Sequence, residues 1–159
     1  MKYNQTLVVG LAVGLLVACT GMGPHTGLVG QDRGAVLAKL GAPAQEVKTA
    51  DGARLFYPNG PMGKGTYVFN VDAKGVVTGV EDVLTPANFM RITAGMGAED
   101  VEALIGPTRS IRTTTQDYKI WVYPFHNSVC QIFMVEMSAQ NKVLSTANGP
   151  APECEGISM

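Results

Sequence analysis

The amino-acid sequence predicts an α+β protein made of two tandem repeats, each with short helices packed on an antiparallel β-sheet. Three observations lead to this prediction. Residues of the same class recur in order at a spacing of 65 or 66 positions, each copy opens with a short helical pattern, and four runs of alternating apolar and polar residues follow each helical pattern. About 140 residues follow Cys19, enough for one domain or two small ones.

The internal repeat is visible in both the helical and the strand segments. At a spacing of 65 the matched pairs are Gly30 with Gly95, Val36 with Val101, and Gly41 with Gly106. At a spacing of 66 they are Leu55 with Trp121, Tyr57 with Tyr123, and Val71 with Met137. A single inserted residue accounts for the change in spacing. The repeat therefore predicts two copies of one fold, at residues 29–84 and 85–147.

The main helix of each copy is marked by its ends. Asp32 is a favourable N-cap for a helix that ends at Leu40, and Gly41 follows as a C-terminal stop. The counterpart is predicted at residues 98–105, with acidic residues in its first turn, and a shorter helical stretch at residues 85–92. Helices of about two turns are not stable alone, so we expect them to lie on an apolar sheet.

Eight strands are predicted from period-two alternation between turn residues. In the first copy they lie at residues 45–50, 53–58, 66–72 and 76–84, and in the second at residues 110–115, 118–123, 129–137 and 142–146. One face of each sheet is expected to pack under its helix. The other face is free to meet solvent or the neighbouring copy.

The N-terminal segment predicts export and attachment to a membrane. Residues 1–18 join a cationic start to an apolar run shorter than the roughly 20 residues of a membrane-spanning helix, which is typical of a signal peptide. The four residues that end at Cys19 resemble the bacterial lipobox, whose cysteine is acylated. Residues 19–28, rich in Gly, are predicted to be a lipidated flexible tether. The alternative is ordinary secretion with cleavage nearby.

The other two cysteines, Cys130 and Cys154, are predicted to form a disulfide, because an exported protein folds in an oxidising compartment. The bridge would tie down residues 148–159, a tail with neither an apolar period nor strand composition. The alternative is a pair of unbonded buried thiols.

The charge balance excludes one class of partner. The 12 Lys and Arg residues and the 13 Asp and Glu residues are scattered along the chain. Because no basic patch or stripe forms, the sequence does not predict binding to nucleic acid.

Neither catalysis nor cofactor binding is predicted. The histidines are His25, in the tether, and His126, in a loop, and a triad of His126 with Asp117 and Ser128 is a weaker interpretation than an exposed loop histidine. The widely spaced His and Cys residues offer no metal signature. Residues 60–66 look a little like a phosphate-binding loop, but a strand follows them instead of a helix, so a hairpin loop is predicted.

Residues 89–107 resemble the start of the BamE family of small outer-membrane lipoproteins. The residues that carry the resemblance are Ile92, Gly95, Met96, Val101, Gly106 and Pro107, followed later by Trp121-Val122-Tyr123. The resemblance implies two BamE-like units and a role in the outer-membrane envelope, such as support of the machinery that inserts β-barrel proteins. Core members have one unit, however, and paired units are also similar to β-lactamase inhibitor protein, whose sheets form a concave face that clamps a partner.

Together these features predict a non-enzymatic lipoprotein of the outer membrane that faces the periplasm. Thr20 follows the lipidated cysteine where Asp would resemble an inner-membrane retention signal. The expected role is binding of envelope proteins, with the β-barrel assembly machinery as a candidate partner, in assembly or maintenance of the envelope. The alternative is a lipid-anchored inhibitor or sequestering protein for a periplasmic enzyme, which would expose a concave aromatic sheet face. An enzyme or small-ligand binder is the third hypothesis.

Overall fold

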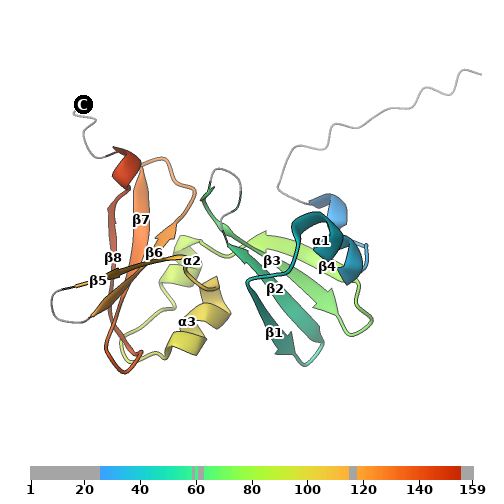
Figure 1. Cartoon of the computed structure of the whole chain (residues 1–159), viewed down its shortest axis with the longest axis horizontal. Helices are drawn as coiled ribbons and strands as arrows, with labels where there is room; N and C mark the ends of the chain where they lie inside the picture. Colours follow the sequence, from blue (N-terminus) through green and yellow to red (C-terminus); the bar gives the residue numbers. More distant parts are fainter. Residues whose placement is uncertain (1–25, 59, 61–62, 115–117, 155–159) are drawn as a thin grey trace, which may run out of the picture.

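The computed structural model describes residues 26–58, 60, 63–114 and 118–154, and it is an α+β fold with two four-stranded antiparallel sheets (Figure 1). Strand order follows the sequence in both sheets, β1-β2-β3-β4 and β5-β6-β7-β8. This is the two-unit α+β organisation that the sequence predicts. The predicted signal peptide, Cys19 and most of the tether lie outside the described residues.

The bounds of the elements agree closely with the repeat. The first sheet contains β1 (Gln45–Thr49), β2 (Gly52–Pro58), β3 (Thr66–Asp72) and β4 (Val77–Asp82), with α1 (Arg33–Leu40) on one face. The second contains β5 (Ser110–Thr113), β6 (Lys119–Pro124), β7 (Gln131–Met137) and β8 (Val143–Pro150), with α2 (Pro86–Phe89) and α3 (Ala98–Ile105). Short 3-10 turns, η1 (Thr26–Leu28) and η3 (Pro152–Cys154), lie near the two ends of the described chain.

Equivalent hydrogen bonds fix the main helix of each unit to its sheet. Asp32 caps α1, as predicted, by accepting from the amide of Ala35 at 2.9 Å. The hydroxyl of Tyr57 donates to the carbonyl of Gly41, just past α1, at 2.9 Å. The hydroxyl of Tyr123 donates in the same way to the carbonyl of Gly106, just past α3, at 3.2 Å. The two units therefore share individual hydrogen bonds as well as sequence pattern.

The last hairpin of each sheet is also built alike. Asp72 accepts two backbone amides of its turn through one carboxylate oxygen, and Ser138 accepts the equivalent pair through its hydroxyl. Gly75 and Asn141 occupy the left-handed position of these turns, with φ of 85° and 55°. Asn is the residue that best replaces Gly in this conformation, which explains the substitution between copies.

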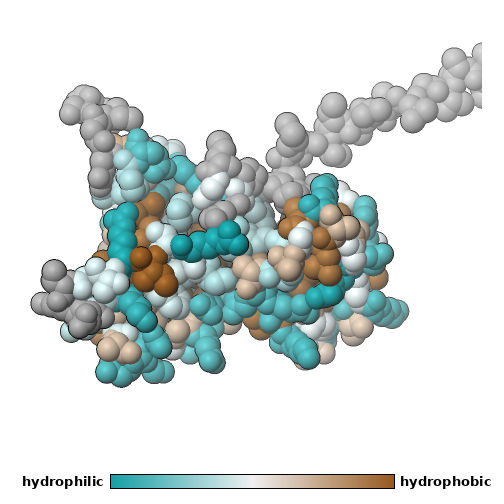
Figure 2. Space-filling model, in the orientation of Figure 1, coloured by the Kyte–Doolittle hydropathy of each residue, from teal (hydrophilic) through white to brown (hydrophobic). Residues whose placement is uncertain are grey.

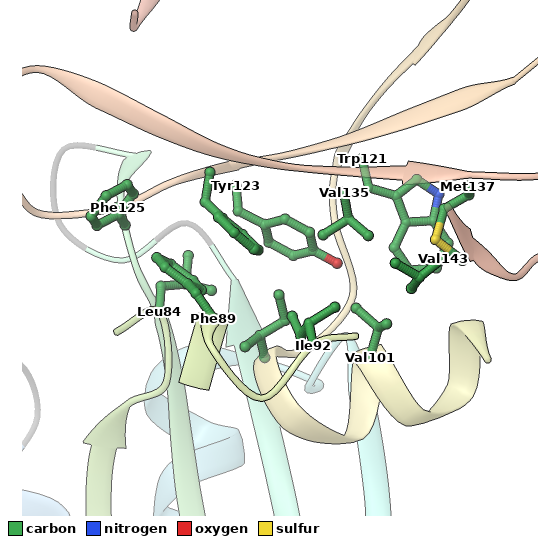
Figure 3. Packing of buried hydrophobic residues seen from close by; sticks show 12 residues of the cluster. Leu84, Phe89, Ile92, Val101, Trp121, Tyr123, Phe125, Val135, Met137 and Val143 are labelled. Atoms are coloured by element: carbon green, nitrogen blue, oxygen red, sulfur yellow. The ribbon is translucent and has the colours of Figure 1, made fainter. Parts of the chain in front are cut away.

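Each sheet is joined to its own helices by one apolar core. The first core joins α1 and η1 to the first sheet through Leu28, Val36, Leu55, Tyr67, Phe69, Val71 and Val77. The second joins α2 and α3 to the second sheet through Leu84, Phe89, Ile92, Val101, Ile105, Trp121, Tyr123, Phe125, Phe133, Val135, Met137 and Val143 (Figure 3). In both units the aromatic face of the sheet is the face that the helices cover.

The opposite face of the first sheet is covered by α3 of the second unit. Arg54, on this face of β2, donates to the carbonyl of Ala103 in α3 at 2.8 Å. Phe56, two residues along the same strand, is fully buried and packs against the end of α3 at Gly106. Helix α3 thus lies between the two sheets (Figure 1). The corresponding face of the second sheet is partly open. The period-two pattern allowed this face to meet either solvent or the neighbouring unit, and the first sheet meets the neighbouring unit while the second partly meets solvent.

The strand bounds differ from the predictions mainly in the last hairpin. β8 extends to Pro150, beyond the predicted end at Thr146, and β7 begins at Gln131 and not at Val129. Backbone pairing with β7 holds this stretch of β8 as an edge strand, although its small and polar residues give no strand pattern. The prediction that the tail from residue 148 lacks strand structure is therefore wrong for its first three residues.

Candidate functional site

An open groove of about 530 Å³ lies between α2 and β8. Its aromatic floor comes from three separate segments: Phe89 in α2, Phe125 after β6, and Phe133 in β7. Phe89 stacks on Phe133 with ring centroids 3.9 Å apart, and Phe125 meets Phe89 edge-on at 5.1 Å. All three side chains are buried, so the floor is a fixed part of the second core (Figure 3).

The rim of the groove carries two exposed apolar side chains. Met90, at the end of α2, is 78% exposed, and Val129, in the loop between β6 and β7, is 66% exposed. An unbranched Met side chain adapts to irregular partners, and contiguous exposed apolar surface is typical of interaction sites. The groove thus offers a rigid floor and an adaptable rim.

Asn127 shapes the loop that holds Val129 in place. Its side-chain oxygen accepts from the amides of Val129 at 3.2 Å and Gln131 at 2.9 Å. Its side-chain nitrogen donates to the carbonyls of Phe125 at 3.0 Å and Gln131 at 2.7 Å. One side chain therefore bonds four backbone groups and fixes the path of the loop, which is the use that turns make of Asn.

The predicted disulfide between Cys130 and Cys154 is present and lies at the end of this loop, with the two Cα atoms 6.4 Å apart. Beside it, the amide of Ala151 donates to the carbonyl of Cys130 at 2.9 Å. Ala151 is buried against Val122 and Ile132 on the outer face of the second sheet. The bridge and η3 therefore close one end of this outer face, which is equivalent to the face of the first sheet that α3 covers.

In the described chain, charged and titratable side chains are found around α3 and not in the groove. Among the described residues that line the groove, none is charged. Burial raises the pKa of Glu102 in α3, and nearby Glu99 raises this pKa further. Burial also raises the pKa of Tyr123, whose hydroxyl bonds to the end of α3. These shifted groups belong to the packing of α3 and lie outside the groove.

The residues considered for chemistry do not converge on a site. His126 and Ser128 are exposed loop residues, and Asp117 and His25 lie outside the described residues. In the described part of the chain no group of His, Cys, Asp and Glu could hold a metal ion. Within residues 26–154, gaps excepted, no helix has the length and apolar character needed to cross a membrane.

The hairpin loop at residues 60–66 contributes to contact between the two units. The amide of Gly65 donates to the carbonyl of Pro124 at 3.0 Å. Lys64 pairs with Glu153 in η3 at 3.1 Å. The Lys that suggested a phosphate-binding loop thus bonds a carboxylate of the same chain, and β3 follows the loop as predicted.

Sequence reasoning missed the groove and its organising residue. Met90 and Val129 are far apart in sequence and carry no pattern of their own. Asn127 had a signal, because an Asn between two strands often folds the loop around its side chain. Phe89 and Phe133 belonged to separate predicted elements and Phe125 followed a predicted strand, and only the fold brings the three rings together.

The comparisons with known proteins leave the family open, since no family model and no curated protein matches the chain. A DUF4309 family protein (YjgB) from Bacillus subtilis subsp. subtilis str. 168 is similar over 79% of this chain and 83% of its own, with 20% identity and a TM-score of 0.28. An extracellular protein containing a SCP domain from Bacillus anthracis str. Ames is similar over 97% of this chain, with 12% identity and a TM-score of 0.27. This chain spans 51% of that second protein. Likenesses this weak carry no argument about function.

Proposed function

We propose that this protein is a non-enzymatic lipoprotein of the outer membrane, anchored at Cys19 and facing the periplasm, which binds other envelope proteins through the groove between α2 and β8. The observation that carries the proposal is the groove itself: an aromatic floor, an exposed Met and Val at the rim, and no charged residue among its described lining. Such a surface suits apolar side chains of a protein partner. Support of the β-barrel assembly machinery is the role that the resemblance to the BamE family favours.

The surface is better suited to binding than to catalysis. Acid, base and nucleophilic catalysis need titratable groups aimed at a bound substrate. The groups with raised pKa values in the described chain lie outside this groove: Glu102 and Tyr123 pack around α3, and Tyr57 and Tyr67 line a separate pocket of the first unit. The inhibitor alternative predicted an exposed aromatic sheet face, whereas the aromatic faces of both sheets are buried under their helices, so an inhibitor would have to bind through the same groove. The identity of the captured partner separates an assembly role from inhibition.

Anchoring is tested by replacing the lipidated residue. In Cys19→Ala the precursor is expected to stay unlipidated and to disappear from outer-membrane fractions, because the acyl chains supply the membrane affinity. Immunoblots of fractionated envelopes measure this, with Cys130→Ser as a control that leaves the lipobox intact. If Cys19→Ala still fractionates with the outer membrane, the lipoprotein assignment is wrong.

Partner binding is tested at the rim of the groove. Met90→Asp and Val129→Asp are expected to reduce recovery of crosslinked envelope partners by about tenfold or more, because a carboxylate cannot be desolvated cheaply in an apolar contact. Ile111→Asp is the matched control, since Ile111 is a 54% exposed apolar residue outside the groove. Partners are identified by mass spectrometry after affinity purification.

The three variants allow partner recovery to be compared between matched substitutions in the same protein. All replace an exposed apolar residue by Asp, so general effects of added charge are shared. If Met90→Asp, Val129→Asp and Ile111→Asp all recover as much partner as the parent protein, the binding surface lies elsewhere. Loss in all three would point to nonspecific adhesion.

A further inference from the structure

β8 is the edge strand without charged residues. Among the other edge strands, β1 carries Glu46 and Lys48, β4 carries Glu81 and Asp82, and β5 carries Arg112. β8 has no charged side chain in eight residues. Charges on an edge strand discourage pairing with another chain. β8, at the outer edge of the second sheet (Figure 1), lacks this protection.

Part of the backbone of β8 points away from the sheet. In an antiparallel ladder the backbone groups alternate between the partner strand and the opposite side. The amide of Ala151 donates to Cys130, which sets the phase, so the amides of Thr146 and Asn148 point outward. Within the described residues no strand pairs with β8 on that side. Only the start of β8, at Val143, is already bonded there, to the segment that precedes α3.

Both faces of the sheet are hollowed beside this free edge. On the inner face is the groove between α2 and β8, which Thr146 and Asn148 help to line. On the outer face is a hollow of about 170 Å³, whose lining residues are Ile120, Met134, Glu136, Ser145 and Ala147. Hydrophobic side chains gather over this sheet in Figure 2, among hydrophilic ones.

We propose that β8 accepts an extended segment of a partner protein as a fifth strand of the second sheet. The side chains of a strand alternate between its two faces, so one set would enter the groove and the other would lie over the outer hollow. The groove side calls for large apolar residues. The outer side, beside Glu136, calls for neutral or basic residues. This inference rests on the proposed function, because it assigns a binding mode and a partner chemistry to the same groove.

A second copy of β8 does not suit the edge. On the groove side β8 would present Thr146 and Asn148, which are small and polar. They would leave a groove floored by three Phe residues unfilled, and unfilled apolar space weakens packing. A heterologous strand with large apolar residues at alternate positions fills it.

The test uses a synthetic peptide that matches the length of β8, with Phe and Val alternating with Lys and Thr, and a scrambled peptide that groups its apolar residues together. Residues 20–159, expressed without the predicted signal peptide and without the lipidated cysteine, are expected to bind the alternating peptide and not the scrambled one. Thr146→Pro removes an amide that the β7–β8 ladder does not use, and it is expected to weaken binding by about tenfold. Thr146→Val replaces the same side chain but keeps the amide, so a loss of affinity that is larger in Thr146→Pro than in Thr146→Val is assigned to the outward amide.

Hydrogen exchange gives a second readout that needs no variant. Peptide binding is expected to slow exchange at the amides of Thr146 and Asn148, and to leave those of Ser145 and Ala147, which already pair with β7, unchanged. This measurement decides the matter if Thr146→Pro fails to fold.

The outcomes separate strand addition from groove binding. If Met90→Asp and Val129→Asp abolish partner capture while Thr146→Pro binds normally and neither outward amide is protected, strand addition is refuted and the proposed function stands. If the rim variants capture partners normally, the proposed function fails. Failure to distinguish the alternating from the scrambled peptide refutes strand addition. So does protection of Thr146 by concentration-dependent self-association, which would make a second copy the occupant.

Discussion

Replacing Cys130 and Cys154 together by Ser is expected to lower the free energy of unfolding by about 3 kcal/mol. The bridge joins residues separated by 24 positions, and a closed loop of that length restricts the unfolded chain by roughly this amount in the loop-entropy account. In the folded state the loss is local. Ala151 and η3 lose their covalent tie, while the pairing of β7 with β8 is kept.

Urea unfolding of the oxidised parent and of the double Ser variant measures this difference. Dithiothreitol is expected to bring the parent down to the stability of the variant and to leave the variant unchanged. Hydrogen exchange should then speed up first near residues 150–154. A loss below about 1 kcal/mol would mean that strand pairing and the burial of Ala151 hold the tail without the bridge.

Local signals in the sequence were sufficient for the elements whose ends are set by single residues. The structure confirms the N-cap at Asp32 and the ends of α1 at Leu40 and of α3 at Ile105. These positions depend on capping and on backbone conformations that Gly adopts easily, and both act within a few residues. The repeat added the second copy of each element.

The role of α3 between the sheets was not predictable from such signals. Arg54 occupies an outward position of β2, where its charge would indicate solvent. Its guanidinium instead donates to the carbonyl of Ala103 near the end of α3, and it lies over the ring of Phe56 at 5.0 Å. An Arg that bonds the last carbonyls of a helix and covers an apolar ring has the same sequence pattern as a solvated one. The distinction exists only once both units are folded.

The groove and the full length of β8 escaped prediction for related reasons. The residues of β8 after Thr146 are small or polar, and their strand conformation comes from backbone pairing with β7. The groove depends on Met90 and Val129, which the fold places on one rim. Tertiary contact, and not local pattern, determines both features.

The interface between the units can be tested with two glycines that occupy equivalent positions. Gly41 follows α1 with φ 80° and ψ −165°, and Gly106 follows α3 with φ 79° and ψ 172°. Non-Gly residues rarely adopt this conformation, so an Ala at either position is expected to cost about 1–3 kcal/mol from the backbone alone. The surroundings of the two glycines differ, because only the second meets the other unit.

Gly106→Ala is therefore expected to lower the free energy of unfolding by about 1–3 kcal/mol more than Gly41→Ala does, which is the usual cost of overpacking. A methyl group at Gly106 would lie 2.8 Å from Cγ2 of Thr66 and 2.9 Å from Cδ1 of Phe56, both in the first sheet. A methyl group at Gly41 would meet nothing within 4 Å. Urea unfolding of the two single variants yields the difference directly, with the shared backbone cost removed.

A double-mutant cycle identifies the source of the extra cost. Thr66→Ser deletes the methyl group that would collide, so it is expected to recover part of the loss in Gly106→Ala and none of the loss in Gly41→Ala. This coupling would show that α3 presses against the first sheet in solution, because residues 66 and 106 belong to different units. Equal costs for the two Ala variants, with no coupling to residue 66, would instead mean that the units share no close contact at the end of α3 and that each sheet is stabilised only by its own helices.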